Sequence, residues 1–250
     1  MDVFFVFLAI LAVTIAGVSK GGFGAGATFA ATPVLAISVG PVAAAAILLP
    51  ILVVMDWFSL RVYWRQWRWS IVWPMMLAGI PGVILGWILF RELNVAWLSI
   101  VLGSVTLVLL AYQFFASFMK PSAHATKPSA IGAGWWGGLT GFTSFLMHAG
   151  GPPFAVYLLP MKLTKREYQA SSVLLFTFLN AIKLLPYFAL GLFDTSNLVI
   201  SLWLLPVAPL AVLLGVWAHH KVREVIFYRI AYSLAILASA KLLWDGFAAL

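Results

Sequence analysis

The sequence predicts an all-α integral membrane protein whose two halves cross the bilayer with inverted topology. The first observation is composition: 64% of the 250 residues are hydrophobic and only 9% are charged, whereas about a quarter of a soluble domain is charged. The second is a glycine-rich break that interrupts apolar sequence twice, 124 residues apart. The third is the distribution of lysine and arginine, which gather in loops on one predicted face.

Ten apolar segments follow one another along the chain, and about 20 residues are needed to cross a bilayer as a helix. They cover residues 3–18, 26–39, 41–58, 70–90, 95–117, 130–146, 151–161, 168–190, 197–218 and 226–248. The segments beside the glycine breaks are short. We therefore predict about eight long transmembrane helices plus two broken or re-entrant helical hairpins, with eight to ten spans in total.

The two breaks have related composition. The first covers residues 17–26 (Gly-Val-Ser-Lys-Gly-Gly-Phe-Gly-Ala-Gly), and the second covers residues 141–153 (Gly-Phe-Thr-Ser-Phe-Leu-Met-His-Ala-Gly-Gly-Pro-Pro). Irregular backbone at membrane depth is tolerated where it lines a cavity or is buried in protein. The helices that follow begin near Gly26 and Pro152, so their N–H groups and positive dipole ends face the breaks, which suits an anion. Close helix packing through small residues is the alternative.

The basic residues predict the orientation. If each broken segment returns to its starting side, only Arg91 falls in a loop on one face, and ten basic residues fall on the other: Arg61, Arg65, Arg68, Lys120, Lys127, Lys162, Lys165, Arg166, Lys221 and Arg223. Basic loops stay in the cytoplasm, so both termini are predicted outside. If each broken segment instead crosses as one helix, the bias falls to about five against six.

The repeat extends beyond the breaks. Asp56 and Asn180 match at the same offset as the two glycine clusters, and the prolines, glycines and Arg-Glu pairs of residues 81–92 and 209–224 are also parallel. Coincidence in apolar sequence is the alternative. We predict one membrane domain made of a first repeat (1–117), a polar cytoplasmic linker (118–129) and a second repeat (130–250), each repeat being a hairpin plus three helices.

Two lysines lie inside apolar segments and are candidate anion ligands. A lysine at membrane depth costs about 3 kcal/mol on insertion scales and needs a partner. Lys20 in the first break and Lys183 in segment 168–190 would each be balanced by a bound anion, unless they snorkel to the membrane surface. The full predicted binding set is Ser19, Lys20, Gly21, Gly22, Gly24, Gly26, Ser144, His148, Gly150, Gly151, Thr177, Asn180 and Lys183.

His148 and Asp56 are the candidates for coupling to a proton. Histidine changes charge near physiological pH, although a buried neutral histidine that bonds to freed backbone is an equal alternative. Asp56 is placed near Arg61, so a local ion pair is as well supported as proton coupling. Ser144 and His148 would share a helix face, but no orienting carboxylate follows them, which argues against a hydrolase.

Several classes of function are excluded or disfavoured. The chain has no cysteine, which removes disulfides, thiolate catalysis and cysteine metal sites, and we predict no cofactor or metal. The Trp- and Arg-rich residues 57–73 are typical of an aromatic belt at the membrane surface rather than of a nucleic-acid-binding patch. No phosphate-binding loop for ATP is present. The expected partners are the bilayer and a small anion, and the aromatic-rich outer surfaces are compatible with a homodimer.

The two breaks, together with Pro33 and Tyr157-Leu158, resemble the TauE/SafE family of sulfite and sulfonate exporters, a branch of the TSUP superfamily. The likeness covers nearly the whole chain, because the family consists of two such repeats. Lys20 in the first motif and His148 in the second are similar to the TauE branch. Lys20 and Phe23 depart from the commoner glycine-triplet form of the first motif.

The resemblance implies a secondary transporter in a bacterial-type plasma (inner) membrane that exports sulfite or a sulfonate by alternating access. The chain would then not be an enzyme. Two hypotheses of other classes stay open from the residues alone. One is an intramembrane enzyme that acts on a lipid-linked substrate, and the other is a passive anion channel or accessory subunit.

Overall fold

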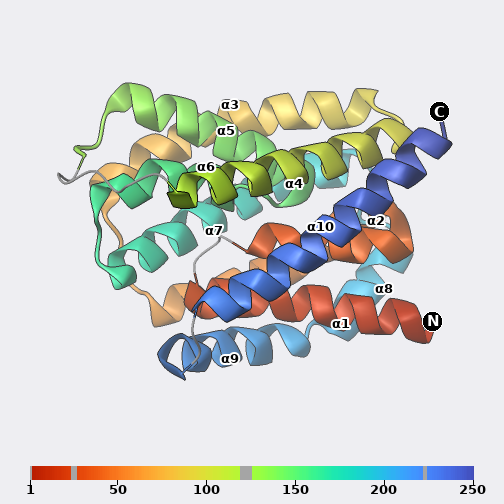
Figure 1. Ribbon diagram of the computed structural model, residues 1–250, viewed down its shortest axis with the longest axis horizontal. Coiled ribbons are helices and arrows are strands. Elements are labelled where there is room, and N and C mark those ends of the chain that lie inside the picture. The colour runs from red at the N-terminus through yellow and green to blue at the C-terminus, as the bar shows by residue number, and fades with distance from the viewer. Residues whose placement is uncertain (1, 24–26, 119–125, 222–223) are drawn as a thin grey trace.

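The computed structural model describes residues 2–23, 27–118, 126–221 and 224–250, and in these ranges the chain is helical with no strand. The long helices pack side by side, and both termini lie at one end of the bundle (Figure 1). The α-helices are α1 (Val3–Val18), α2 (Ala31–Val62), α3 (Trp69–Glu92), α4 (Val95–Phe118), α5 (Ala130–Met147), α6 (Gly151–Leu158), α7 (Lys165–Ala189), α8 (Thr195–Leu204), α9 (Val207–Lys221) and α10 (Glu224–Ala248).

The first break is a change of helix type. After α1 the chain forms a five-residue π-helix, η1 (Ser19–Phe23), and after the undescribed residues 24–26 a short 3₁₀ helix, η2 (Thr28–Ala30), leads into α2. Wide π turns inside α-helices are frequent at functional sites. The predicted ligands Gly24 and Gly26 lie outside the described residues.

α2 contains a second interruption at Gly40, whose φ of 78° and ψ of 166° belong to a region that is almost exclusive to glycine. The interruption separates the predicted segments 26–39 and 41–58. Pro41 follows it at the first position of the next helical stretch, where its missing N–H and fixed φ are tolerated. α2 packs on α1, and the stretch after Gly40 runs on to the loop at residues 63–68.

The second half of the chain begins with a capped helix. Ser129 Oγ accepts from the Gly132 N–H at the start of α5, and His148 ends α5 in the left-handed conformation with φ of 55°. α6 then starts with prolines in its first turn and continues into the 3₁₀ helix η3 (Leu159–Met161). Of the predicted linker, residues 119–125 lie outside the described chain.

The predicted segment 197–218 is two helices rather than one. α8 and α9 meet at an angle of 43°. Pro206 lies between them, and a proline inside a helix removes a backbone hydrogen bond and displaces the preceding turn. Within the described residues, six helical stretches are long and apolar enough to cross a membrane, and counting the bent pair α8–α9 makes seven.

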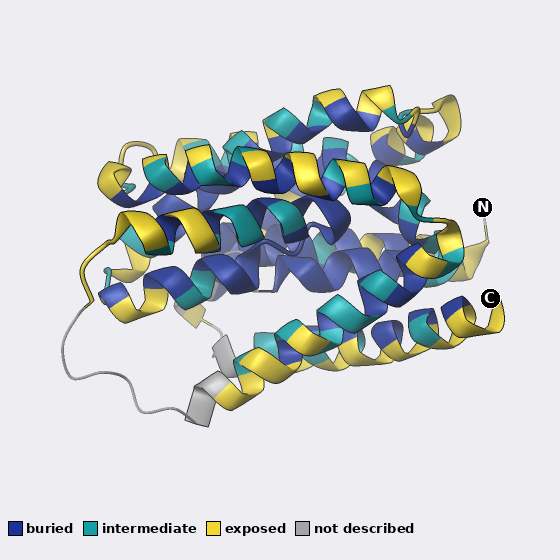
Figure 2. Cartoon of the chain, turned by 90° about the horizontal axis from the view of Figure 1, so that it is seen from above, coloured by how far each residue is buried: buried dark blue, intermediate teal, exposed yellow. Residues whose placement is uncertain are grey.

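The two halves pack into each other in a crossed pattern. α1 of the first half packs on α9, and α5 of the second half packs on α3, while α2 and α7 lie together at the centre. Glycines allow the close approach: a Cβ at Gly141 would lie 2.2 Å from the Gly79 carbonyl oxygen, and one at Gly17 would lie 2.4 Å from Ala211 Cβ. Buried residues concentrate in the central helices, and exposed apolar side chains cover the outer faces (Figure 2).

Candidate functional site

Asp56 of α2 organises one group of buried polar residues. Lys20 Nζ of η1 forms an ion pair with Asp56 Oδ1, and Asn180 Nδ2 of α7 donates to Asp56 Oδ2 at 2.6 Å. The alternative partner Arg61 lies instead over Trp57, with its guanidinium carbon 4.6 Å from the ring centroid. Residues five positions apart do not share a helix face, so Asp56 points into the bundle while Arg61 points outward.

Lys183 of α7 organises a second group. Its Nζ donates to the Ser144 carbonyl oxygen at 2.9 Å and to Ser144 Oγ at 3.1 Å, and it lies 2.9 Å from His148 Nδ1. Lys183 has no solvent exposure, so it does not snorkel to a membrane surface. Within the described residues no carboxylate forms an ion pair with it, and all of its polar partners are neutral.

His148 links the second break to α2. Its Nε2 lies 3.1 Å from the Ala45 carbonyl oxygen, and because a carbonyl only accepts, Nε2 carries the proton. Nδ1 is then the acceptor for Lys183. This tautomer follows from the two partners, and it makes the ring a neutral bridge between α2, α5 and α7.

The two groups meet at one enclosed cavity of about 10 Å³, which is close to the space that one water molecule needs. Thr28 also lines it, and Thr28 Oγ1 is buried with no hydrogen-bond partner among the described residues. The cavity lies between the two breaks and the central helices, and its lining residues are Lys20, Thr28, Leu52, Ser144, His148, Phe176 and Asn180.

The other predicted ligands that the structure describes do not line this cavity. Ser19 Oγ accepts from the Ala27 N–H at 3.2 Å, which ties the two ends of the first break together. Gly21 and Gly22 are buried in η1. Gly21 packs against Val212 of α9, where a Cβ would lie 2.1 Å from the Val212 carbonyl oxygen.

In the second break, a Cβ at Gly150 would lie 2.7 Å from Phe176, which lines the cavity, and Gly151 is the first residue of α6. Thr177 is the exception among the predicted polar residues of α7. It is half-buried, and its hydroxyl donates to the Val173 carbonyl oxygen of its own helix at 2.7 Å.

The sequence profile of the family described as sulfite exporter TauE/SafE matches residues 9–242, which is nearly the whole chain. The chain belongs to the TauE/SafE sulfite exporter family. No curated protein and no solved structure matches it at a significant level. Membership places the protein among membrane transporters, in agreement with its apolar helices, and the matched region includes both glycine breaks and every residue of the cavity.

Three polar residues that position the TauE/SafE breaks escaped the sequence analysis. Thr32 Oγ1 at the start of α2 donates to the Met147 carbonyl oxygen at 2.8 Å, which joins the two breaks directly. Tyr63 donates to the Gly21 carbonyl oxygen at 2.8 Å, and Gln169 Nε2 donates to the Lys20 carbonyl oxygen. No sequence pattern marks these three residues. Thr28, which lines the cavity and was also not predicted, could have been noticed as a hydroxyl immediately after a glycine cluster.

Proposed function

We propose that this chain is a secondary transporter that exports a small sulfur-containing anion, sulfite or a sulfonate, by alternating access. The observation that carries the proposal is the enclosed cavity between the two breaks, which brings together Lys20, Asn180, Ser144 and His148 from both halves of the chain. The family supports transport, and the chemistry of this cavity supports an anionic cargo.

The charges around the cavity favour a single negative charge on the cargo. With ordinary ionisation, Lys20 and Asp56 balance each other, His148 is neutral, and Lys183 leaves one uncompensated positive charge. An unpaired buried charge is costly in a low-dielectric interior. A bound monoanion such as a sulfonate or hydrogen sulfite neutralises the site.

Neutral donors complete the proposed site. The Thr28 hydroxyl faces the cavity and has no hydrogen-bond partner among the described residues. It can donate to a sulfonate oxygen, which accepts hydrogen bonds from hydroxyl and N–H groups. The start of α6 provides further donors beside the positive end of a helix dipole. The Ala149 N–H already donates to the Thr143 carbonyl oxygen. We therefore assign donation to the anion to the N–H groups of Gly150 and Gly151.

The size of the cavity supports alternating access. About 10 Å³ accommodates about one water molecule, whereas a sulfite ion has four non-hydrogen atoms. The breaks must therefore separate for the cargo to enter or leave. In our proposal the repeats 1–117 and 130–250 have inverted topology and rock against each other, and the crossed packing of α1 on α9 and α5 on α3 is the contact at which they move.

We place the basic loops in the cytoplasm of a cell with an inner membrane, following the excess of lysine and arginine at the end opposite both termini. The negative-inside potential then helps an anion to leave. Asp56 and His148 are the proposed coupling residues because each contacts a buried lysine at the cavity.

An enzyme that acts on a lipid-linked substrate is the second candidate, and the contacts of Ser144 count against it. A nucleophilic serine needs a base that is itself oriented by a third group. His148 uses Nε2 for a backbone carbonyl and Nδ1 for Lys183. Neither nitrogen is left to take a proton from Ser144 Oγ, so we infer a carrier rather than a hydrolase.

The test is flux of labelled sulfite and of methanesulfonate into proteoliposomes, with and without a pH gradient. We expect saturable flux and counterflow that Lys20→Ala abolishes. Lys241→Ala is the matched control, since Lys241 pairs with Asp245 on the exposed outer end of α10. Product formation from a lipid-linked substrate would instead indicate an enzyme, and flux that does not saturate would indicate a channel.

A further inference from the structure

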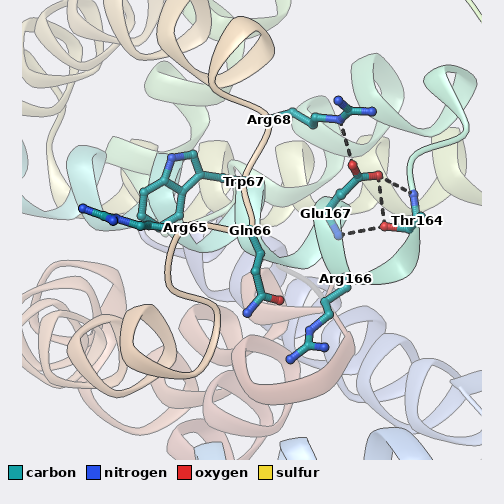
Figure 3. A pocket seen from close by; sticks show the side chains of 7 residues that line it. All are labelled: Arg65, Gln66, Trp67, Arg68, Thr164, Arg166 and Glu167. Atoms are coloured by element: carbon teal, nitrogen blue, oxygen red, sulfur yellow. Dashed lines mark hydrogen bonds and ion pairs between the residues drawn. The ribbon is translucent and has the colours of Figure 1, made fainter.

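A second pocket lies at the end of the bundle opposite both termini. It is an open depression of about 540 Å³ between the α2–α3 loop and the start of α7. Its lining residues are Arg65, Gln66, Trp67, Arg68, Thr164, Arg166 and Glu167 (Figure 3). We call it the arginine pocket.

The arginine pocket carries an excess of positive charge. Its one carboxylate, Glu167, is already engaged: it closes the capping box with Thr164 at the start of α7, and it pairs with Arg68 Nε at 2.8 Å. Arg65 and Arg166 form no ion pair within the described residues. Their guanidinium groups are left free to bind an external anion, and arginine suits oxyanions because its fork of N–H donors matches their geometry.

The loop between α2 and α3 that lines the pocket is held in place by contacts with α7. Arg65 has a φ of 59°, a left-handed conformation that non-glycine residues adopt only when their surroundings impose it. Three residues later the Arg68 N–H donates to Ser171 Oγ of α7 at 3.0 Å. Trp67 packs against the buried cluster of Tyr63, Ala170 and Val173. The loop that presents the arginines is therefore fixed to α7 rather than loose at the surface.

Two residues close in sequence to the pocket lining are hydrogen-bonded to the break that carries Lys20. Tyr63, two residues before Arg65, donates to the Gly21 carbonyl oxygen at 2.8 Å. Gln169, two residues after Glu167, donates to the Lys20 carbonyl oxygen. These two side chains come from the two elements that form the arginine pocket. They connect the arginine pocket to η1, whose Lys20 lines the cavity.

The opposite end of the bundle has a pocket of contrasting charge. It measures about 470 Å³ around the interruption at Gly40 and the α7–α8 connection. Among the described residues, its lining contains Asp194 and no basic side chain. An anion is therefore attracted at one end of the protein and is not retained at the other.

We propose that the arginine pocket is an anion-recruitment site, which attracts a small oxyanion before it passes Tyr63 and Gln169 to the cavity. Arg65 and Arg166 point in different directions (Figure 3), so they act through their summed positive charge rather than as a joint clamp on one anion. The identity of the cargo rests on the proposed function, but the presence of an oxyanion site does not. A phosphate group of a lipid has the same chemistry as a free oxyanion, so the experiment separates the two sources.

The absence of native cysteine permits a direct test on the purified full chain. Gln66→Cys places a thiol in the arginine pocket, and Ser196→Cys places one in the opposite pocket. Each is labelled with a sulfonate-bearing and with a trimethylammonium-bearing methanethiosulfonate. The quantity compared is the ratio of the labelling rate of the anionic reagent to that of the cationic reagent. We expect this ratio to be about tenfold or more higher at Gln66→Cys than at Ser196→Cys, since steering by a charged pocket changes rates by about 10- to 1,000-fold.

Adding Arg65→Gln and Arg166→Gln to the Gln66→Cys background is expected to remove the preference, whereas Arg61→Gln is expected to keep it. Arg61→Gln removes one positive charge at the same end, as each of the two pocket substitutions does alone, but Arg61 lies over Trp57 outside the pocket. Free methanesulfonate or phosphate should slow labelling at Gln66→Cys only when both arginines are present. Equal preference at the two pockets, or an equal effect of Arg61→Gln, would overturn the proposal.

The source of the oxyanion is separated by repeating the labelling in liposomes. In phosphatidylcholine alone, protection by free methanesulfonate supports recruitment of a soluble anion. Protection that appears only when phosphatidylglycerol is added, and that free anions do not reproduce, assigns the pocket to a lipid headgroup and overturns recruitment. Because labelling requires no transport, these outcomes are independent of whether sulfite or sulfonate flux is observed.

Discussion

Asn180 donates a hydrogen bond of 2.6 Å to Asp56, and the two residues occupy positions 124 apart in the chain. The same offset relates the two glycine breaks. Two residues that the sequence predicts to be equivalent in the two halves thus contact each other where α2 meets α7. The contact joins the carboxylate that pairs with Lys20 to α7, the helix that also carries Lys183.

The Lys20–Asp56 pair is expected to show strong energetic coupling. Asp56→Leu leaves a buried lysine without its counter-ion, and removing one partner of a buried pair costs about 3–5 kcal/mol. Lys20→Met combined with Asp56→Leu should recover most of this loss, because no unpaired charge remains. Thermal unfolding in detergent of the two single variants and the double variant checks the cycle. Additive losses would show that the two side chains do not depend on each other.

Lys183 is expected to matter more for anion binding than for folding. Lys183→Gln keeps a donor for Ser144 and His148 but removes the positive charge. Hydrogen bonds to charged groups contribute about 1.5–3 kcal/mol, so we expect affinity for sulfite or a sulfonate to fall by about 10- to 100-fold with a nearly unchanged melting temperature. Binding by calorimetry measures this, with Lys241→Gln as the control. An unchanged affinity would remove Lys183 from the proposed site.

Gly141→Ala is expected to destabilise the packing of α5 on α3. Its Cβ would lie 2.2 Å from the Gly79 carbonyl oxygen, and forcing extra carbon into a packed interface costs about 1–3 kcal/mol. Gly134→Ala on the same helix has no atom within 4 Å of the added Cβ, so it should leave stability unchanged or raise it slightly. Melting temperatures of the two variants side by side provide the comparison, and equal values would contradict the packing argument.

Gly40→Ala tests the interruption in α2. The added Cβ meets nothing within 4 Å, so any effect comes from backbone strain, which is about 1–3 kcal/mol for such conformations. We expect the variant to lose flux in proteoliposomes, because relief of the strain would straighten α2 and shift the pocket at that end. Gly134→Ala is again the control. Full flux in Gly40→Ala would show that the interruption is not needed for transport.

Much of the architecture could be predicted from the chain alone. The apolar segments correspond to observed helices, and residues 17–26 and 141–153 do mark changes in helix structure. The prediction was less accurate at segment 197–218, which bends between α8 and α9. A proline marks where a helix is interrupted, but the angle of the bend depends on what the two pieces pack against.

Several residues that line the cavity were predicted from the sequence, but their contacts were not. Lys20, Asn180, Ser144 and His148 were chosen because polar residues in apolar segments need partners, and the structure places all four around one cavity. Thr177 was chosen on the same grounds, but it bonds to its own helix. Local spacing cannot distinguish a hydroxyl that faces a cavity from one that satisfies the preceding turn.

Composition and the apolar segments were sufficient to predict a helical membrane protein, because hydrophobic transfer and backbone hydrogen bonding act segment by segment. The family was recognised from the resemblance of the two breaks, and the profile match confirmed it. The partner of Asp56, the neutral environment of Lys183 and the arginine pocket were decided only by the tertiary structure. Each of these depends on side chains that are about 40 to 150 residues apart in the chain. Such side chains meet only after the helices have packed, and no local pattern encodes which of them will face one another.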